Sequence, residues 1–417
     1  MSTLASGGME QSPEEITMKS VIIVGAGVMQ VPAIKIAKSM GLNVIATDRD
    51  PEAEGFKYAD VPVIMDTKDV PGHVQFATAN REKYNISGAF SGADVAITVA
   101  GITNALGLPG IPMDVAVRSN NKAMMKKCWL KAGIPTPYSI EVDNYEDAVR
   151  AIKEINGFPI MVKAIDNAAS RGTKKITTMD ELGPALADAK NNSTTGTALI
   201  EEVISGEEQS VETVVYKGVH YRFGVADRHF GFSPFPIETG HTNPSQLPAD
   251  IQEEMYAIVK KAAIALGIDF GPAKADTMLT EDGPKMLEMP ARLSGGFHSM
   301  YTTPIATGMN PIRAVLNLAI GNPMPEEDAV QKLNRVSVCK AIFPAPGKII
   351  SIKGIEEARK IKGVEQIFLM VKEGELIKEY KNCANRVCYI ITSGDTCREA
   401  NDIFDLAAGT IKIKTAS

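Results

Sequence analysis

The pattern that most constrains the fold is an alternation of apolar runs and amphipathic segments between residues 20 and 115. The run "SVIIVGAG" is typical of a buried strand entering a glycine turn, "VPAIKIAKSMG" of an amphipathic helix, and "LNVIATD" of the next strand. The segments "ADVPVIMD" and "ISGAFSG" continue the series. Strands that alternate with helices predict a parallel sheet with helices on both faces. We therefore expect residues 20–115 to form an α/β domain.

The rest of the chain changes pattern at several points. Two prolines in "IPTP" follow the helical segment "SNNKAMMKKCWLKAG" and indicate a boundary. Short strands and helices come next, then longer strands with a helix and a hairpin, then a tail of short elements. A chain of 417 residues is too long for one core. We predict a disordered leader over 1–19, the α/β domain over 20–115, a helical linker over 116–134, and further units over 135–205, 206–330 and 331–417.

The composition argues against several classes of protein. A formal net charge of −6 does not fit a general nucleic-acid binder, which would carry a basic face. No apolar run approaches the roughly eighteen residues of a membrane helix, and the first twenty residues lack the apolar core of a signal peptide. The five cysteines form no CxxC pair, which favours reduced thiols over a zinc site. We expect a cytoplasmic protein that binds neither nucleic acid nor membrane.

The stretch "VGAGVMQ" invites comparison with a dinucleotide site. Gly25 and Gly27 follow a strand and open a helix, and Asp48 ends the next strand, as in nicotinamide-binding domains. The third position of that fingerprint is Gln30 instead of glycine or alanine, which weakens close packing of the helix on the strand. The stretch therefore has two interpretations: an NAD-dependent oxidoreductase, or a domain of the same nucleotide-binding fold that does not bind this cofactor.

Two lysines stand where an anion would explain them. Lys163 ends the apolar strand "FPIMVKA", and Lys122 sits at the expected start of a helix, where the helix dipole disfavours a cation. The small residues of "IDNAASRGTKKI" allow backbone N–H groups to approach phosphate oxygens, and Arg171 adds positive charge. A strand-end lysine that reaches water beside an ordinary loop is the alternative interpretation.

Two acidic stretches point to a nucleotide and a metal. In "ALIEEVISGEEQSVE", residues 201–204 offer backbone donors and acceptors for a purine and Glu208 offers a carboxylate for a ribose; a solvated acidic turn is the alternative. Further on, "AKADTML" and "MLEMPARLSGG" are strand-like segments joined by "TEDGP", and they carry Asp276 and Glu288. Such a hairpin can hold a divalent metal, with Arg292 just beyond it for an anionic substrate.

Taken in order, these motifs resemble those of the ATP-grasp superfamily, in its carboxylate–amine ligase branch. The resemblance covers about residues 20–325, and the tail is similar to the small C-terminal subdomain of the L-amino-acid ligases. Biotin carboxylase and carbamoyl-phosphate synthase-like enzymes are more distantly similar. The resemblance implies an α/β fold, α+β in the ATP-grasp part. It would comprise a Rossmann-like pre-ATP-grasp domain, an ATP-grasp fold of two subdomains (a central lid over 135–205 and a metal-binding subdomain over 206–330), and a C-terminal α/β subdomain.

The resemblance also implies how ATP and metal are bound. Asp276 and Glu288 would hold two Mg²⁺ ions, or Mn²⁺, between the phosphates. Pro290 stands where many relatives have an asparagine ligand, so either water completes the shell of the second ion or that ion is held less tightly. The residues implied to bind ATP are Lys122 and Lys163 at the phosphates, Ser170, Arg171 and Gly172 in the closing loop, the main chain of Glu201, Glu202, Val203 and Ile204 at the adenine, and Glu208 at the ribose.

The substrate side of the resemblance rests on two loops, "PIETGHTNPSQLP" and "SGGFHS". Arg292 would orient the substrate carboxylate or stabilise an acyl phosphate, and Lys163, His241 and His298 are the other candidate catalytic residues. Histidines without a role are the alternative for the last two, and a solvent-facing strand position is the alternative for Glu212. The candidate substrate-binding residues are Glu212, His241, Arg292, Ser294, Gly295, Gly296 and His298.

The activity implied by the resemblance is that of an ADP-forming carbon–nitrogen ligase. It would activate an amino acid or small carboxylic acid as an acyl phosphate, couple it to an amine, and act as a homodimer. A purine-pathway or carbamoyl-phosphate-type enzyme acting on a sugar-phosphate amine, formate or bicarbonate is the alternative within the superfamily. The NAD-dependent oxidoreductase and a non-catalytic nucleotide sensor are the alternatives outside it.

Overall fold

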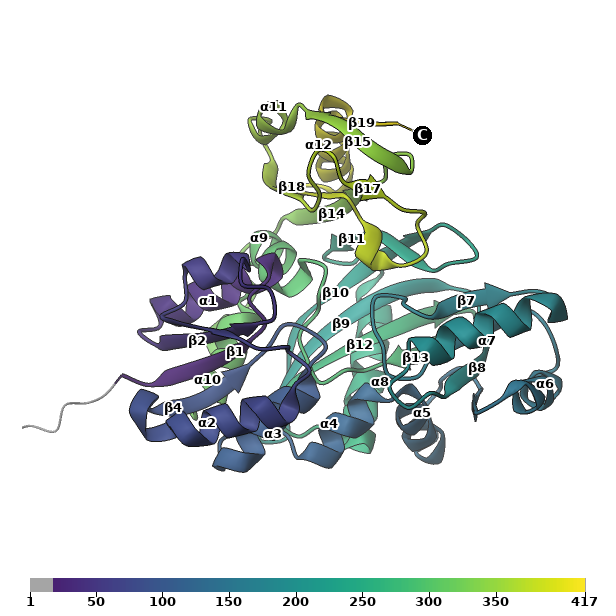
Figure 1. Ribbon diagram of the computed structural model, residues 1–417, viewed down its shortest axis with the longest axis horizontal. Helices are drawn as coiled ribbons and strands as arrows, with labels where there is room; N and C mark the ends of the chain where they lie inside the picture. Colours follow the sequence, from purple (N-terminus) through teal and green to yellow (C-terminus); the bar gives the residue numbers. More distant parts are fainter. Residues whose placement is uncertain (1–17, 417) are drawn as a thin grey trace, which may run out of the picture.

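The computed structural model describes residues 18–416, so residues 1–17 of the predicted leader lie outside the described part. Figure 1 shows the N-terminal part and a smaller lobe on opposite sides of a long central sheet, with the C-terminal part above it. We call the smaller lobe, residues 139–202, the lid. Within residues 18–416, no helix has both the length and the apolar character needed to cross a membrane.

The N-terminal part is a four-stranded parallel sheet with the strand order β3-β2-β1-β4. Alternate residues of β1 pack into two different cores, Val21 and Ile23 into one, Ile22 and Val24 into the other. Because side chains alternate across a strand, apolar layers cover both faces of this sheet. Its elements are β1 (Ser20–Val24), α1 (Val31–Ser39), β2 (Asn43–Asp48), β3 (Val61–Ile64), α2 (Val70–Tyr84), β4 (Ile86–Phe90) and α3 (Ala96–Leu106).

Two linker helices lead from this sheet to the lid. The second of them begins at Lys122, and the side chain of Asn121 caps it by accepting a hydrogen bond from Met124 N. The lid is an antiparallel sheet of order β5-β8-β6-β7, whose apolar core contains only its own residues. The elements are α4 (Met113–Asn120), α5 (Lys122–Lys131), β5 (Ser139–Val142), α6 (Tyr145–Glu154), β6 (Ile160–Ala164), β7 (Thr173–Ile176), α7 (Leu182–Asn191) and β8 (Ala198–Glu202).

The central sheet has eight antiparallel strands in the order β13-β12-β9-β10-β11-β14-β18-β16. The first five lie before residue 290 and the last three after residue 335, so one sheet runs from the hairpin of β12 and β13 into the C-terminal part (Figure 1). Its strands are β9 (Glu207–Tyr216), β10 (Val219–Gly231), β11 (Ile237–Asn243), β12 (Gly271–Thr280), β13 (Gly283–Glu288), β14 (Val336–Ile342), β16 (Val364–Leu369) and β18 (Cys388–Gly394).

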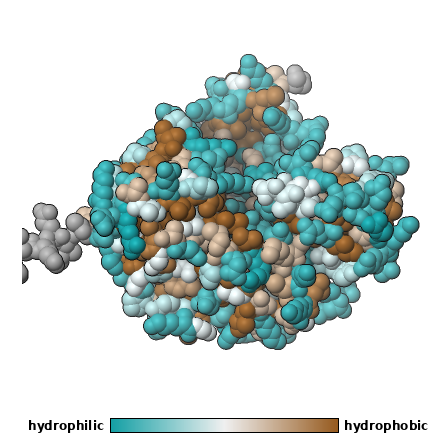
Figure 2. All heavy atoms as spheres, turned by 60° about the horizontal axis from the view of Figure 1, so that its bottom comes forward, coloured by the Kyte–Doolittle hydropathy of each residue, from teal (hydrophilic) through white to brown (hydrophobic). Residues whose placement is uncertain are grey.

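Helices and a small three-stranded sheet complete the molecule. Trp129 of α5 is fully buried against α8, where its indole N–H donates to Ala262 O at 3.2 Å. On the face shown in Figure 2, hydrophobic patches lie over the left and central parts, while the outer rim at the right, over the lid, is mostly hydrophilic. The remaining elements are α8 (Ala249–Leu266), α9 (Thr303–Thr307), α10 (Pro311–Ala319), β15 (Gly347–Lys353), α11 (Ile355–Arg359), β17 (Leu376–Ile377), α12 (Cys397–Thr410) and β19 (Lys412–Ala416).

Candidate active site

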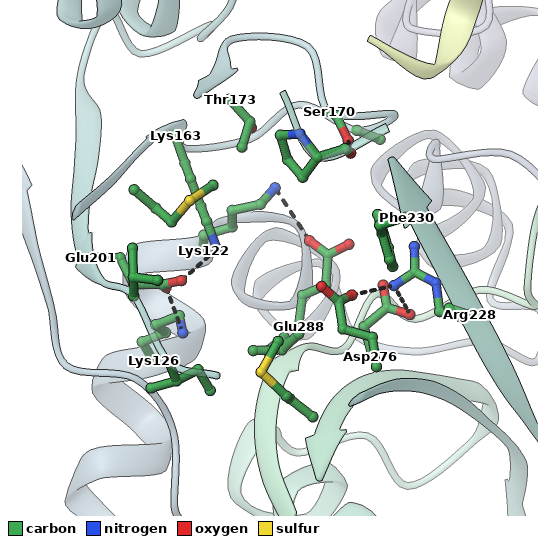
Figure 3. Close-up of a pocket in the computed structure, with 18 of the residues that line it drawn as sticks. Lys122, Lys126, Lys163, Ser170, Thr173, Glu201, Arg228, Phe230, Asp276 and Glu288 are labelled. Carbon is green, nitrogen blue, oxygen red and sulfur yellow. Dashed lines mark hydrogen bonds and ion pairs between the residues drawn. The ribbon is translucent and has the colours of Figure 1, made fainter. Parts of the chain in front are cut away.

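A cavity of about 240 Å³ lies between the lid and the central sheet, and we call it the nucleotide cavity. Figure 3 shows that side chains from α5, from the lid and from the β12–β13 hairpin all enter this space. Ten of the residues expected from the sequence to bind ATP or metal line it: Lys122, Lys163, Ser170, Glu201, Glu202, Val203, Ile204, Glu208, Asp276 and Glu288.

A buried triad of charges closes one end of the nucleotide cavity. Glu201 is 2% exposed, and its carboxylate forms ion pairs with Lys163 and with Lys126, the latter at 2.6 Å (Figure 3). Burial opposes the charge of Glu201, but the two lysines outweigh it and hold its pKa below the ordinary value. Burial lowers the pKa of Lys126 to about 8. The side chain of Glu201 therefore fixes the two lysines.

The loop between β6 and β7 forms the roof of the cavity. Ala169 and Ser170 have positive φ angles, and Ser170 Oγ donates to Pro236 O at 2.7 Å. Gly172 also has a positive φ of 65°, and a Cβ there would lie 2.8 Å from the Cβ of Asn192. Gly172 lines neither this cavity nor the second one described below, so its place is in the turn. Arg171 points to the second cavity.

The two acids of the hairpin are brought together by strand register. Asp276 of β12 pairs directly with Glu288 of β13, which places the two carboxylates side by side. Glu288 lies 3.4 Å from Lys122 Nζ. Burial opposes its ionisation, but Lys122 and Lys274 outweigh burial and hold the pKa of Glu288 well below its usual range. Asp276 is contacted by Lys274 and Arg228, at 2.5 and 2.9 Å.

These acids fit a magnesium ion. Mg²⁺ takes oxygen ligands and is commonly held by one or two carboxylates together with water and substrate phosphates. Asp276 and Glu288 supply two such carboxylates at the edge of the nucleotide cavity. Among residues 18–416, no cluster of three or more acid, histidine or cysteine side chains is arranged to hold a metal. The remaining ligands of an ion there would therefore come from phosphate and water.

A second cavity of about 400 Å³ adjoins the first, and we call it the substrate cavity. The two share seven lining residues, among them Ser170, Arg228, Asp276 and Glu288. The guanidinium of Arg292 lies in the substrate cavity and is paired through Nε with Asp94, which follows β4 of the N-terminal part. The candidate substrate residues that line this cavity are His241, Arg292, Ser294, Gly295, Gly296 and His298. Arg171, which the sequence predicted at the nucleotide, lines this cavity and does not line the nucleotide cavity.

The two histidines are buried and neutral. Their rings lie 5.2 Å apart, and His241 Nε2 pairs with Thr302 Oγ1 at 2.9 Å. Burial lowers the pKa of His241 to about 4, and burial together with His241 lowers that of His298 well below its ordinary value. His298 Nε2 has no hydrogen-bond partner among the described residues. At neutral pH both rings therefore offer hydrogen bonds and carry no charge.

Glu212 lies behind the substrate loop and lines neither cavity. It is fully buried on β9, where its carboxylate accepts hydrogen bonds from Ser294 N at 3.1 Å and from the hydroxyl of Ser299. Burial raises the pKa of Glu212. This residue holds the loop that carries Ser294 to Gly296, so any effect on a substrate acts through that loop.

Several residues of the site were missed in the sequence. Lys274 lies two positions before Asp276 on one strand, so the two share a face, and this spacing could have revealed it. Arg228 of β10 lies opposite Glu208 of β9, and this contact could be found only by knowing which strands pair. Asp94 meets Arg292 from a part of the chain 198 residues away, and nothing local indicates that contact.

Side chains of the protein itself accept hydrogen bonds from backbone N–H groups at the glycine turn after β1 and at the end of β4. The carboxylate of Asp48 accepts a hydrogen bond from Ala26 N at 2.9 Å. The side chain of Gln30 is buried and accepts one from Gly92 N at 3.0 Å. The groups that a dinucleotide would use are thus engaged in joining β1, β2 and β4. This arrangement does not favour the NAD-dependent alternative.

Comparison with known proteins gives matches along most of the chain. Family models match as "ATP-grasp domain" over residues 156–300, "L-amino acid ligase C-terminal domain 2" over 341–416 and "Alanine dehydrogenase/PNT, C-terminal domain" over 1–108. The crystal structure of L-amino acid ligase from Bacillus licheniformis matches with a TM-score of 0.82 and 21% identity, covering 96% of this chain and 99% of that one.

Two curated relatives extend the comparison. D-alanine–D-alanine ligase of Aromatoleum aromaticum is 31% identical over 198 residues, which are 46% of this chain and 63% of that protein, so less than two thirds of that relative is spanned. Phosphoribosylamine–glycine ligase of Pasteurella multocida is 27% identical over 363 residues, 81% of this chain and 82% of that protein. The predicted α/β fold and the predicted kinship with ATP-grasp ligases are confirmed. Residues 156–300 match the ATP-grasp domain and residues 341–416 match the L-amino acid ligase C-terminal domain 2, which is the combination of domains that the sequence motifs predicted.

Proposed function

We propose that the chain is an ADP-forming carboxylate–amine ligase that acts on an amino acid or a small carboxylic acid. The observation that supports this most is the junction of the two cavities at Asp276 and Glu288. A nucleotide in the first cavity would present its terminal phosphate where a carboxylate in the second can reach it. The ligase relatives and the ATP-grasp domain support ATP, with Mg²⁺ or Mn²⁺, as the partners of this reaction.

The chemistry follows from the weakness of a carboxylate as an electrophile. An oxygen of the substrate carboxylate attacks the γ-phosphorus of ATP, and the bond to ADP breaks. The amine then attacks the acyl carbon, and phosphate leaves with the proton that the nitrogen loses. The protein positions the reactants and neutralises charge, with Lys122 and Lys163 at the phosphates and Arg292 at the carboxylate. A divalent ion at Asp276 and Glu288 would neutralise further charge on the phosphate oxygens.

The lid gives this chemistry a dry site. An acyl phosphate is lost to water unless water is excluded, and closing domains serve that purpose in many enzymes. The lid has its own apolar core, and its loop at Ser170 already rests on Pro236 of the central part. These features support closure of the lid as one rigid body over the nucleotide.

The alternative enzymes of the ATP-grasp type differ from the proposed ligase in the substrate that reacts with the activated phosphate. The similarity to phosphoribosylamine–glycine ligase keeps a sugar-phosphate amine as the second candidate substrate. A purine-pathway or carbamoyl-phosphate-type enzyme would share the nucleotide cavity and differ in the substrate cavity. The expected homodimer and the cytoplasmic location stay predictions.

The test is a phosphate-release screen of amino acids and small carboxylic acids, each paired with amines, in the presence of ATP and Mg²⁺. We expect phosphate and an amide product in equal amounts for at least one pair. Glu288→Gln should lower this rate by at least about 100-fold, as expected when transition-state charge stabilisation is lost. The control Glu281→Gln, in the exposed hairpin turn, should leave it unchanged. ATP binding without turnover for any pair would favour the sensor, and NADH oxidation without ATP turnover the dehydrogenase.

A further inference from the structure

Two cations are bound to the carboxylate that was expected to ligate metal. Lys274 and Asp276 lie two residues apart on β12 and therefore share a face. Lys274 Nζ lies 2.5 Å from Asp276 Oδ1, and Arg228 Nη1 lies 2.9 Å from the same oxygen (Figure 3 shows the Arg228 contact). Both cations make these contacts with the same oxygen atom of Asp276.

Neither cation is free to leave. Lys274 is only 6% exposed, in the middle of a paired strand. Arg228 is also held by two further carboxylates, Glu208 and Glu238, each at 3.2 Å. Three acids thus surround one guanidinium, and the nearest of them is Asp276. Moving Arg228 away would break its ion pairs with Glu208 and Glu238, and breaking a buried ion pair is strongly unfavourable.

The oxygen donors suffice for one ion. Glu288 and Asp276, whose carboxylate is already paired with two cations, are the two acids that face each other across the hairpin, and Pro290, two residues after Glu288, has no side-chain oxygen. One or two carboxylates with phosphates and water are an ordinary set for a single Mg²⁺. A second dication sharing Asp276 would stand next to the ammonium of Lys274 and the guanidinium of Arg228. Like charges at such close range repel strongly in a buried site.

We propose that this site takes a single divalent ion, held by Glu288 with Asp276, and that Lys274 and Arg228 take the place of the second ion as fixed positive charges. The inference rests on the proposed function, because it requires a nucleotide in the adjoining cavity. It replaces the two ions that the resemblance implies by one ion and two side chains. Lys274 also lines the substrate cavity, so its charge is available to the phosphoryl group in transfer.

The number of ions is measured directly. The full chain is saturated with the non-hydrolysable ATP analogue AMPPNP and titrated with Mn²⁺, and free Mn²⁺ is followed by its electron paramagnetic resonance signal. Nucleotide binding is measured separately by calorimetry. We expect about one nucleotide-dependent Mn²⁺ per chain. Two per chain, with the nucleotide bound, would overturn the single-ion site and leave the proposed function standing. No nucleotide binding at all would overturn both.

Variants test the role of the two side chains. In Lys274→Met combined with Pro290→Asn, one fixed charge is removed and an amide oxygen is added, so we expect the bound Mn²⁺ to rise from about one to about two per chain. The control Lys285→Met, a lysine of β13 that pairs with Asp282, should stay at one. Trp129 fluorescence verifies that each variant is folded. A folded double variant that still binds one ion would refute the assignment of Lys274.

Discussion

The buried triad allows a quantitative prediction for Glu201→Gln. Glu201 and Lys126 are 2% and 1% exposed, and Glu201 is the counterion of both Lys126 and Lys163. Removing one partner of a buried ion pair costs about 3–5 kcal/mol. Lys126 limits its share by losing its proton: its pKa of about 8 would fall below 7, which adds about 1.4 kcal/mol at pH 7, since one pKa unit is worth about 1.36 kcal/mol. Lys163 loses its counterion as well, so we expect a total loss of about 3 kcal/mol, at the lower end of the range for a broken buried pair.

The pH dependence of this loss has a definite sign. Burial lowers the pKa of Lys126 from its unfolded value of 10.5 to about 8, so its burial destabilises the fold fully below pH 8, and this penalty fades as the pH rises from 8 towards 10.5. At pH 9 Lys126 is mostly neutral in the wild type as well. The difference between wild type and Glu201→Gln should therefore shrink by about 1.4 kcal/mol between pH 7 and pH 9.

Urea unfolding followed by fluorescence measures both effects. Trp129 is the only tryptophan of the chain, is fully buried, and lies one helical turn from Lys126 on α5. The control is Glu202→Gln, because Glu202 is half-buried and its carboxylate accepts a hydrogen bond from Tyr138 N; it should lose at most about 1 kcal/mol. Equal stabilities of the two variants at pH 7 would refute the reasoning.

Three further predictions concern the rest of the site. In the proposed reaction, the planar guanidinium of Arg292 would hold the substrate carboxylate, and Arg292→Lys removes it. We expect kcat to fall at least about tenfold with little change in the KM for ATP, measured by phosphate release; an unchanged kcat contradicts this role. Burial raises the pKa of Glu208 to about 7, so its carboxyl group ionises as the pH rises from 6 to 8. The ionised carboxylate is the stronger hydrogen-bond acceptor for the ribose, so the KM for ATP should fall over this range in the wild type but not in Glu208→Gln. Gly172→Ala puts a Cβ against Asn192 at a positive φ and should cost about 1–3 kcal/mol in thermal unfolding, whereas Gly183→Ala, in the open on α7, should not destabilise.

The fold class was predictable because local patterns determine it. The apolar run of β1 is buried at every position, and it alternates with helices as a parallel sheet requires. The motifs around Lys163 and Glu288 stood out because charges ended apolar strands. These are properties of a few neighbouring residues, and they need no knowledge of the rest of the chain.

The contacts within the site were less predictable because they depend on pairing across long distances. Arg228 meets Asp276 only because β9 lies between β10 and β12 in the sheet. Glu212 appeared as one of several alternating strand positions, and its burial behind Ser294 follows from the packing of a segment 82 residues away. Partners so far apart in the chain leave no periodic pattern that spacing could reveal.

The pairing of β11 with β14 determines how the chain can be divided. Backbone groups of residues 240–243 bond to those of residues 337–340, so β14, β18 and β16 continue the sheet that holds the β12–β13 hairpin. A truncation at residue 330 would uncover a row of unpaired N–H and C=O groups, which promotes association with other chains. The lid, by contrast, has a separate sheet and core. The lid can therefore be exchanged between such proteins as a unit, whereas the C-terminal part can be exchanged only together with the strands it pairs with.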